Sequence, residues 1–196
     1  RPFIERWLAS GGVLPPVSFA EFALWTEVGE RQLRRLGVAR GARVAMLAHA
    51  CVDSLALSLA IPSVGAVLVN LNWRHSEATL RALVRSMDCE VLIAGRGLAE
   101  LGRRLAASSR VRALLMLEGS GSEAGIHSVR EHATSCDPAL EPPGQPGADQ
   151  RLPPRVDGAA SSRDVAVVMF TSGTTALPKA VPLTHAGLLW SCATKE

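Results

Sequence analysis

The sequence predicts an α/β fold: a sheet covered by helices on both faces, followed by the start of a second α/β subdomain. Three observations carry this prediction. Short apolar runs alternate with segments of helical period between residues 19 and 117. The apolar runs lack period-two polarity, which is typical of parallel strands buried on both faces. A further apolar run, residues 165–170, follows a long stretch rich in Gly, Ser and Pro.

The first predicted helix, residues 19–36, begins at a recognisable cap. Ser18 and Glu21 have the spacing of a capping box, in which each side chain accepts a hydrogen bond from the other residue's backbone N–H. Apolar side chains then recur at three- and four-residue steps, and Gly37 stands where a left-handed C-terminal cap is expected. The same alternation of helix and strand then repeats, so further helices are expected over residues 52–64, 76–86 and 98–108.

Short buried strands are predicted between these helices, over residues 43–48, 66–69, 90–94 and 111–117. The 20 residues 54–73 carry no charge and are long enough to raise the possibility of a membrane span. Pro62 and Gly65 interrupt this segment. At Gly65 the helical spacing of the apolar residues gives way to a run of β-branched residues. A buried helix followed by a buried strand is therefore expected, with no transmembrane segment.

The predicted organisation has three parts. Residues 1–118 are expected to form a first α/β subdomain, and residues 119–163 a Gly/Pro/Ser-rich connection in which only residues 126–133 have helical character. Residues 164–196 are expected to supply a strand, a phosphate-binding loop and a helix that open a second subdomain. Thr184 is a suitable N-cap for that helix, residues 186–192.

Composition limits the classes of function. With 47% hydrophobic and 20% charged residues, the chain is expected to fold around a core. Its net charge of +3 is small and its basic residues are scattered, so we expect no nucleic-acid partner. The four cysteines show no C-x-x-C pair, so we expect free thiols and a cytoplasmic location. His49 and Cys51 lie close together, but two potential ligands are too few for a metal, so we expect no metal site.

One segment, residues 171–179, has the composition of a phosphate-binding loop. Thr171, Ser172, Thr174 and Thr175 offer hydroxyls, Gly173 permits close backbone approach, and Lys179, one of only two lysines in the chain, adds a positive charge. The segment leaves the end of a buried strand, where ligands bind in open α/β sheets. Pro178 and Ala180 exclude a Walker loop. A Ser/Thr-rich surface turn is the alternative reading of the same residues.

These residues resemble the signature of the adenylate-forming enzymes, which include acyl-CoA synthetases, the adenylation domains of peptide synthetases and luciferases. The family signature reads like TSGTTG-x-PKG-V followed by Thr-His or Ser-His, and residues 171–185 read TSGTTALPKAVPLTH. Residues 36–95 also look like the N-terminal region of that family, with the same succession of strands and helices. The resemblance therefore covers roughly residues 18–196.

The resemblance implies a two-step ligase reaction that uses ATP, Mg²⁺ and coenzyme A. A carboxylic acid attacks the α-phosphorus of ATP to give an acyl-adenylate and pyrophosphate, and a thiol then displaces AMP. Carried over to this chain, the hydroxyls of Thr171, Ser172, Thr174 and Thr175, the backbone at Gly173 and the charge of Lys179 would bind the β- and γ-phosphates. None of these residues is a nucleophile, so no catalytic residue is expected within the chain.

Two readings of the function follow. In the first, the chain is the N-terminal fragment of an AMP-forming acyl-CoA synthetase and is inactive alone, because it ends 17 residues beyond Lys179 and the family's later catalytic elements come after that point. In the second, it is a degenerate, non-catalytic relative that binds or regulates, since Ala176 and Ala180 replace glycines of the signature. A stand-alone phosphate-binding domain is a third, weaker reading.

Overall fold

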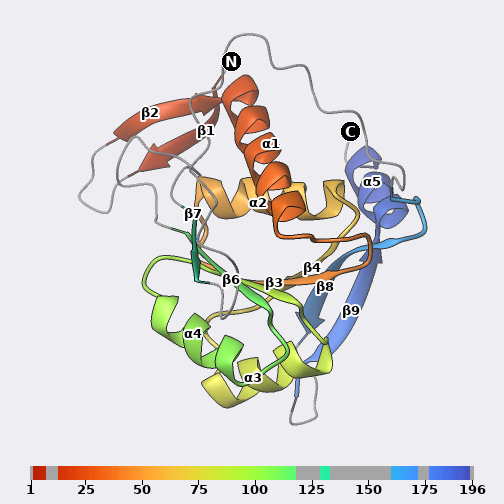
Figure 1. Ribbon diagram of the computed structural model, residues 1–196. Coiled ribbons are helices and arrows are strands. Elements are labelled where there is room, and N and C mark those ends of the chain that lie inside the picture. Colours follow the sequence, from red (N-terminus) through yellow and green to blue (C-terminus); the bar gives the residue numbers. More distant parts are fainter. Residues whose placement is uncertain (1, 8–12, 118–128, 133–159, 172–176, 195–196) are drawn as a thin grey trace.

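The computed structural model describes residues 2–7, 13–117, 129–132, 160–171 and 177–194 (Figure 1). In chain order the elements are β1 (Pro2–Trp7), β2 (Val13–Ser18), α1 (Phe19–Arg35), β3 (Arg43–Leu47), α2 (Val52–Ser63), β4 (Val67–Asn70), α3 (Glu77–Ser86), β5 (Val91–Ala94), α4 (Ala99–Ala107), β6 (Ala113–Leu117), β7 (Val129–His132), β8 (Val165–Thr171), β9 (Lys179–Thr184) and α5 (His185–Ala193).

Most of the strands join one seven-stranded sheet of order β7-β6-β5-β3-β4-β8-β9. The five inner strands are parallel to one another, and the edge strands β7 and β9 run antiparallel to their neighbours. β1 and β2 form a separate antiparallel hairpin. The predicted α/β fold, with a mainly parallel sheet, is confirmed.

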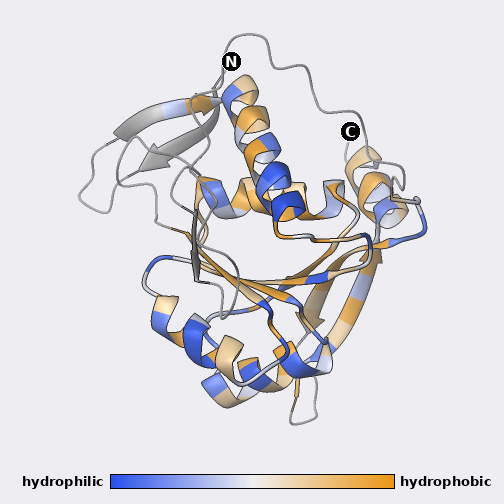
Figure 2. Ribbon diagram, in the orientation of Figure 1, coloured by the Kyte–Doolittle hydropathy of each residue, from blue (hydrophilic) through white to orange (hydrophobic). Residues whose placement is uncertain are grey.

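Helices cover both faces of this sheet, as the unbroken apolar strands predict. α1 and α2 lie on one face, and α3 and α4 lie on the other (Figure 1). Successive residues of β3 point to opposite faces: Val44 packs in the core beneath α2, and Ala45 packs in the core above α3 and α4. Two apolar cores therefore hold the sheet between its helices, and the apolar sides of the helices face them (Figure 2).

The charge-free segment 54–73 folds as predicted. It supplies most of α2, whose last turn contains Pro62, and then β4, three of whose four residues are buried. Among the residues that the structure describes, no helix combines the length and the apolar character that crossing a membrane requires.

The capping box of α1 is also confirmed. The Glu21 N–H donates to Ser18 Oγ at 3.2 Å, and the Ser18 N–H donates to Glu21 Oε2 at 2.8 Å. The predicted cap of α5 forms as well, since the Gly187 N–H donates to Thr184 Oγ1 at 3.1 Å. These contacts satisfy backbone N–H groups that a helix start otherwise leaves without an intrahelical partner.

We expect Ser18→Ala to lower the free energy of unfolding by about 1 kcal/mol, because it removes the acceptor for the Glu21 N–H. Urea denaturation followed by circular dichroism measures the change. Ser63→Ala is the matched control, because the Ser63 hydroxyl only donates to the Leu59 carbonyl at the end of α2. Equal effects of the two substitutions would show that the capping box does not stabilise α1.

Two parts of the sequence-based prediction differ from the structure. The helix expected at residues 126–133 is wrong: β7 lies there and pairs antiparallel with β6, with Leu117 opposite Val129 and Leu114 opposite His132. The edge of β6 offers unpaired backbone groups, and pairing with it outweighs a weak local helical preference. The chain after the loop first forms β9 before α5 begins, a strand that the sequence analysis did not anticipate.

The strand predicted to open a second subdomain lies in the same sheet as the strands of the first. β8 pairs in parallel with β4, with Val69 opposite Val168. A carboxylate at the start of this segment also bonds to the first part of the chain, because Arg40 Nε donates to Asp164 Oδ2 at 2.8 Å. The position of β8 is thus fixed by the sheet that precedes it. The predicted boundaries at 118 and 164 stay a prediction.

Candidate functional site

The carboxyl ends of the parallel strands meet along one edge of the sheet, and the chain leaves this edge in two directions. From β3 it passes through α2 on one face, and from β5 it passes through α4 on the other (Figure 1). At this switch point Gly95 N donates to Leu47 O at 2.9 Å. A Cβ on Gly95 would lie 3.0 Å from Ala48 Cα, which is tighter than most real Cβ contacts, so glycine suits the close approach of the two exits. Ligands of doubly wound sheets bind at this edge.

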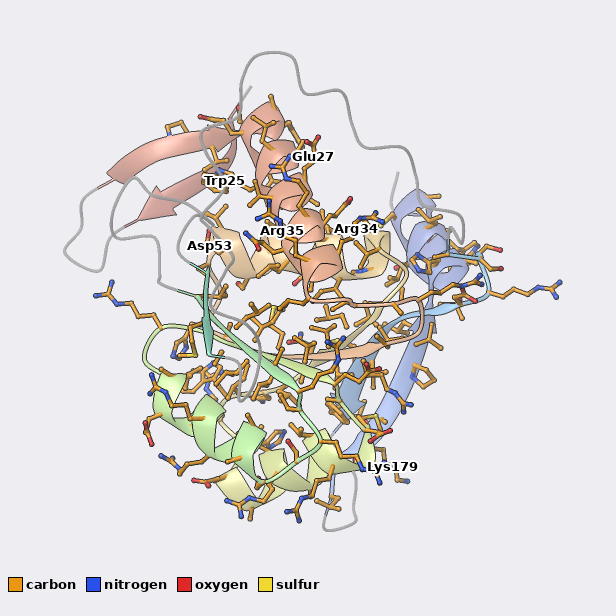
Figure 3. All side chains as sticks on the ribbon, viewed as in Figure 1. Trp25, Glu27, Arg34, Arg35, Asp53 and Lys179 are labelled. Atoms are coloured by element: carbon orange, nitrogen blue, oxygen red, sulfur yellow. The ribbon has the colours of Figure 1, made fainter. Side chains whose placement is uncertain are left out.

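The two strands that flank the predicted phosphate loop meet at the same edge. β8 ends at Thr171 and β9 begins at Lys179, and these two residues face each other as the last pair of the antiparallel ladder. Both are exposed, and Figure 3 shows Lys179 where β9 begins. The hairpin therefore brings a hydroxyl and an ammonium group together at the two ends of the loop.

Of the six predicted site residues, Thr171 and Lys179 are described. The other four, Ser172, Gly173, Thr174 and Thr175, lie outside the described residues. Within the part of the chain that the structure describes, no carboxylate forms an ion pair with Lys179. No described residue therefore neutralises its positive charge. A lysine that binds phosphate needs its charge available in this way.

Ala180, which replaces a signature glycine, lies inside β9 opposite Phe170. Among the described non-glycine residues, only Asp88 has a positive φ, so the backbone at Ala180 is one that any L-residue adopts. The structure thus gives no conformational reason for glycine at position 180.

A second group of side chains, missed by the sequence analysis, lies at the same edge. The turn after β4 is closed by the Arg74 N–H, which donates to Asn72 Oδ1 at 3.0 Å. The Arg74 guanidinium lies 4.5 Å from the centre of the Trp73 ring, and the His49 ring meets Trp73 edge-on at 4.5 Å. The sequence did contain a signal for this group, because His49 and Trp73 each follow a predicted parallel strand.

The opposite end of β8 is held by a network around Asp164. Its carboxylate accepts from the Ser161 N–H at 2.8 Å and pairs with Arg40 at 2.7 Å. The hydrogen bond from Ser161, and then the Arg40 guanidinium, hold the pKa of Asp164 below its ordinary 3.8. The Asp164 carbonyl accepts from the His185 N–H at 3.1 Å, so this network joins the starts of β8 and α5.

Stability is expected to depend on the ionisation of Asp164. Because its pKa is lower in the folded chain than in the unfolded one, its contribution is complete above the ordinary value of 3.8 and is lost as the pH falls through the folded value. Asp164→Asn should therefore lower the free energy of unfolding at pH 7, and the deficit should shrink as the pH falls below 3.8. Urea denaturation at a series of pH values measures it.

Asp88→Asn is the matched control, because the Asp88 carboxylate meets Arg110 only at 3.6 Å with both side chains largely exposed. A deficit of Asp164→Asn that does not change with pH would contradict an electrostatic role for its carboxylate.

The described cysteines are free thiols. Cys89 lies in the core, where burial raises the pKa of its thiol to about 12, so it stays protonated and unreactive at neutral pH. Cys192 on α5 is exposed. Within the described ranges no three His, Cys, Asp or Glu side chains converge as metal ligands.

Comparison with known proteins gives one family and a consistent set of relatives. The family model described as AMP-binding enzyme matches residues 17–196. The acyl-CoA ligase sidI of Aspergillus fumigatus is 31% identical over 171 residues, which are 81% of this chain and 27% of that protein. The long-chain-fatty-acid–CoA ligase FadD15 of Mycobacterium bovis is 31% identical over 183 residues, 91% of this chain and 28% of that protein. The chain thus spans less than a third of either relative.

Solved structures share the fold. Apo MatB from Rhodopseudomonas palustris superposes with a TM-score of 0.65 at 20% identity, covering 95% of this chain and 32% of that one. The inhibitor-bound N-terminal domain of FACL13 from Mycobacterium tuberculosis gives a TM-score of 0.61 at 22% identity, covering 92% of this chain and 40% of that one.

The family match, the relatives and the shared fold agree with the signature loop between β8 and β9. The chain belongs to the AMP-binding enzyme family, the adenylate-forming enzymes that its sequence resembles.

Proposed function

We propose that this chain is the N-terminal part of an ATP-dependent, AMP-forming acid–thiol ligase. The complete enzyme joins a carboxylic acid to the α-phosphate of ATP with release of pyrophosphate, and then transfers the acyl group to a thiol, with coenzyme A as the acceptor. The curated relatives that are acyl-CoA ligases support this reaction class.

The observation that carries the proposal is the hairpin that presents the loop. Thr171 and Lys179 face each other across the β8–β9 ladder, at the edge of the sheet where doubly wound folds bind ligands. A phosphate group held between them would meet a neutral donor from one strand and a full positive charge from the other. Both kinds of group bind phosphate oxygens strongly.

The loop's role is to position and stabilise the pyrophosphate that leaves. Hydroxyls of Thr171, Ser172, Thr174 and Thr175 would donate to β- and γ-phosphate oxygens, while Gly173 lets the backbone approach them. Lys179 offsets negative charge that grows on the leaving group. Mg²⁺, when bound with ATP, neutralises part of the same charge.

The structure bears on the non-catalytic alternative at one position. That reading rests on Ala176 and Ala180, and Ala180 has an unstrained strand conformation. Ala176 is then the one substitution that still supports it. We also propose a cytoplasmic location, which the cysteine spacing of the sequence supports, because the four cysteines form no C-x-x-C pair and no dense framework.

ATP–pyrophosphate exchange by the complete gene product, with short, medium, long and aromatic carboxylic acids, tests the proposal. Exchange with one class of acid is the expected result, and Ala176→Gly should keep or raise it. The 196-residue chain alone should show none. Absence of exchange with every acid, in both the natural protein and Ala176→Gly, would instead favour the non-catalytic relative.

A further inference from the structure

A cavity of about 470 Å³ lies between the last turn of α3 and the chain that joins α4 to β6. Asp88 precedes β5 and Arg110 precedes β6, so the cavity lies at the edge of the sheet where these parallel strands begin. Thr171 and Lys179 lie at the opposite edge, and neither lines it. Its volume is typical of sites for small molecules. The lining residues are Val84, Arg85, Asp88, Ser108, Ser109 and Arg110.

Two arginines give the cavity its charge. The Arg85 side chain is held in place, because its Nε donates to the Ser108 carbonyl at 2.7 Å. A guanidinium group has five N–H donors, so this bond leaves both terminal nitrogens of Arg85 available to a ligand. Among the described residues, no carboxylate forms an ion pair with Arg85. Arg110 is 86% exposed and meets the Asp88 carboxylate only at 3.6 Å.

The backbone at the end of α4 does not oppose this positive charge. Free carbonyls at the C-terminal end of a helix carry partial negative charge, which repels anions. Here the hydroxyls of Ser108 and Ser109 donate to the Leu105 carbonyl at 3.0 and 2.8 Å, and Arg85 donates to the Ser108 carbonyl. Because these carbonyls already accept hydrogen bonds, the two guanidinium groups determine which ligands the cavity attracts.

The surroundings of the cavity are also basic. Arg43 and Arg112 lie at the same edge of the sheet, at the starts of β3 and β6. Glu90 accompanies them and meets Arg112 at 3.5 Å. Together with the charged residues of the lining, they make four arginines against two carboxylates. The positive potential of such a group draws anions toward the cavity.

We propose that this cavity binds the phosphate group of a small molecule, at a site separate from the loop between β8 and β9. A phosphate group has enough oxygens to accept hydrogen bonds from Arg85 and Arg110 together, whereas one guanidinium fork already satisfies the two oxygens of a carboxylate. A metal cation fits poorly, because two positive groups line the cavity. The inference does not depend on the proposed ligase reaction.

Modification of arginines by a dicarbonyl reagent, measured residue by residue with mass spectrometry, tests this site in the complete protein. Inorganic phosphate is the probe, and sodium chloride keeps the ionic strength constant. When phosphate reaches about ten times its Kd, modification of Arg85 and Arg110 should slow about tenfold, as mass action requires. Arg103 is the matched control, because it is an exposed arginine of α4 that does not line the cavity, and its rate should not change.

Variants show whether the two arginines act together. Arg110→Ala should remove most of the protection that phosphate gives to Arg85, and Arg103→Ala should leave it unchanged. Asp88→Asn should strengthen the protection, because it removes a negative charge from the lining. Asp88 has a φ of 49°, which asparagine also adopts, so this variant keeps the backbone. Lys179→Ala should not alter the protection of Arg85.

Several results would overturn the proposal. Acetate that protects Arg85 and Arg110 as well as phosphate does would contradict a phosphate site. Arg85 and Arg110 that resist the reagent even without phosphate would show that the cavity is closed to ligands. Protection that disappears in Lys179→Ala would assign the bound phosphate to the loop between β8 and β9. None of these measurements requires catalysis, so they decide the site even if the proposed ligase reaction is absent.

Discussion

Replacing Lys179 by alanine is expected to lower kcat/KM for ATP in the exchange reaction about 100-fold. The structure places this lysine opposite Thr171 at the end of the hairpin, exposed and without a described carboxylate partner. The variant would lose a charge-assisted contact to phosphate oxygens but keep the strand pairing, because a backbone ladder does not depend on the side chain. Initial rates over a range of ATP concentrations measure the effect.

Lys195→Ala is the control, since Lys195 is the only other lysine in the chain. Lys179→Arg should retain part of the activity, because it keeps the charge but changes the geometry of the donors. If Lys179→Ala and Lys195→Ala were equally active, Lys179 would have no role at the phosphates.

Gly102→Val is expected to destabilise the fold by about 3 kcal/mol or more. Gly102 is buried in α4, and a Cβ there would lie 2.6 Å from the Ala94 Cβ on β5. Real Cβ atoms do not approach so closely, so α4 or β5 must shift, and both belong to the packed core on this face. Valine has a higher helix propensity than glycine, but that gain is at most about 1 kcal/mol and does not offset the clash.

Thermal or urea denaturation measures this loss. Ala107→Val is the matched control, because it adds the same side chain at an exposed position of the same helix. A cost for Gly102→Val no larger than that of Ala107→Val would contradict the tight packing of α4 on β5.

The elements that the sequence predicted best are those in which local signals and burial agree. α1 carries both a capping box and an amphipathic pattern, and the structure confirms it within one residue at its C-terminus. β3 and β5 are apolar runs between such helices, and both are buried in the centre of the sheet. In these segments the residue pattern alone determines which face is inside.

The edge strands could not be predicted in this way. β7 and β9 are defined by pairing with β6 and β8, and β9 contains Pro182, which lacks an N–H and weakens a strand prediction. Local periodicity carries no information about such long-range pairing. At the candidate site, likewise, composition found Thr171 and Lys179, whereas the contact of His49 with Trp73 depends on which strands become neighbours.

The central claim is that the loop between β8 and β9 holds the phosphates of ATP. Photo-crosslinking of the complete protein with an ATP analogue that carries its photoreactive group on the γ-phosphate tests this most directly, with the labelled peptide read by mass spectrometry. Label on residues 171–179, removed by excess ATP, is the expected result. ATP-sensitive label confined to other peptides, with residues 171–179 unmodified, would contradict it.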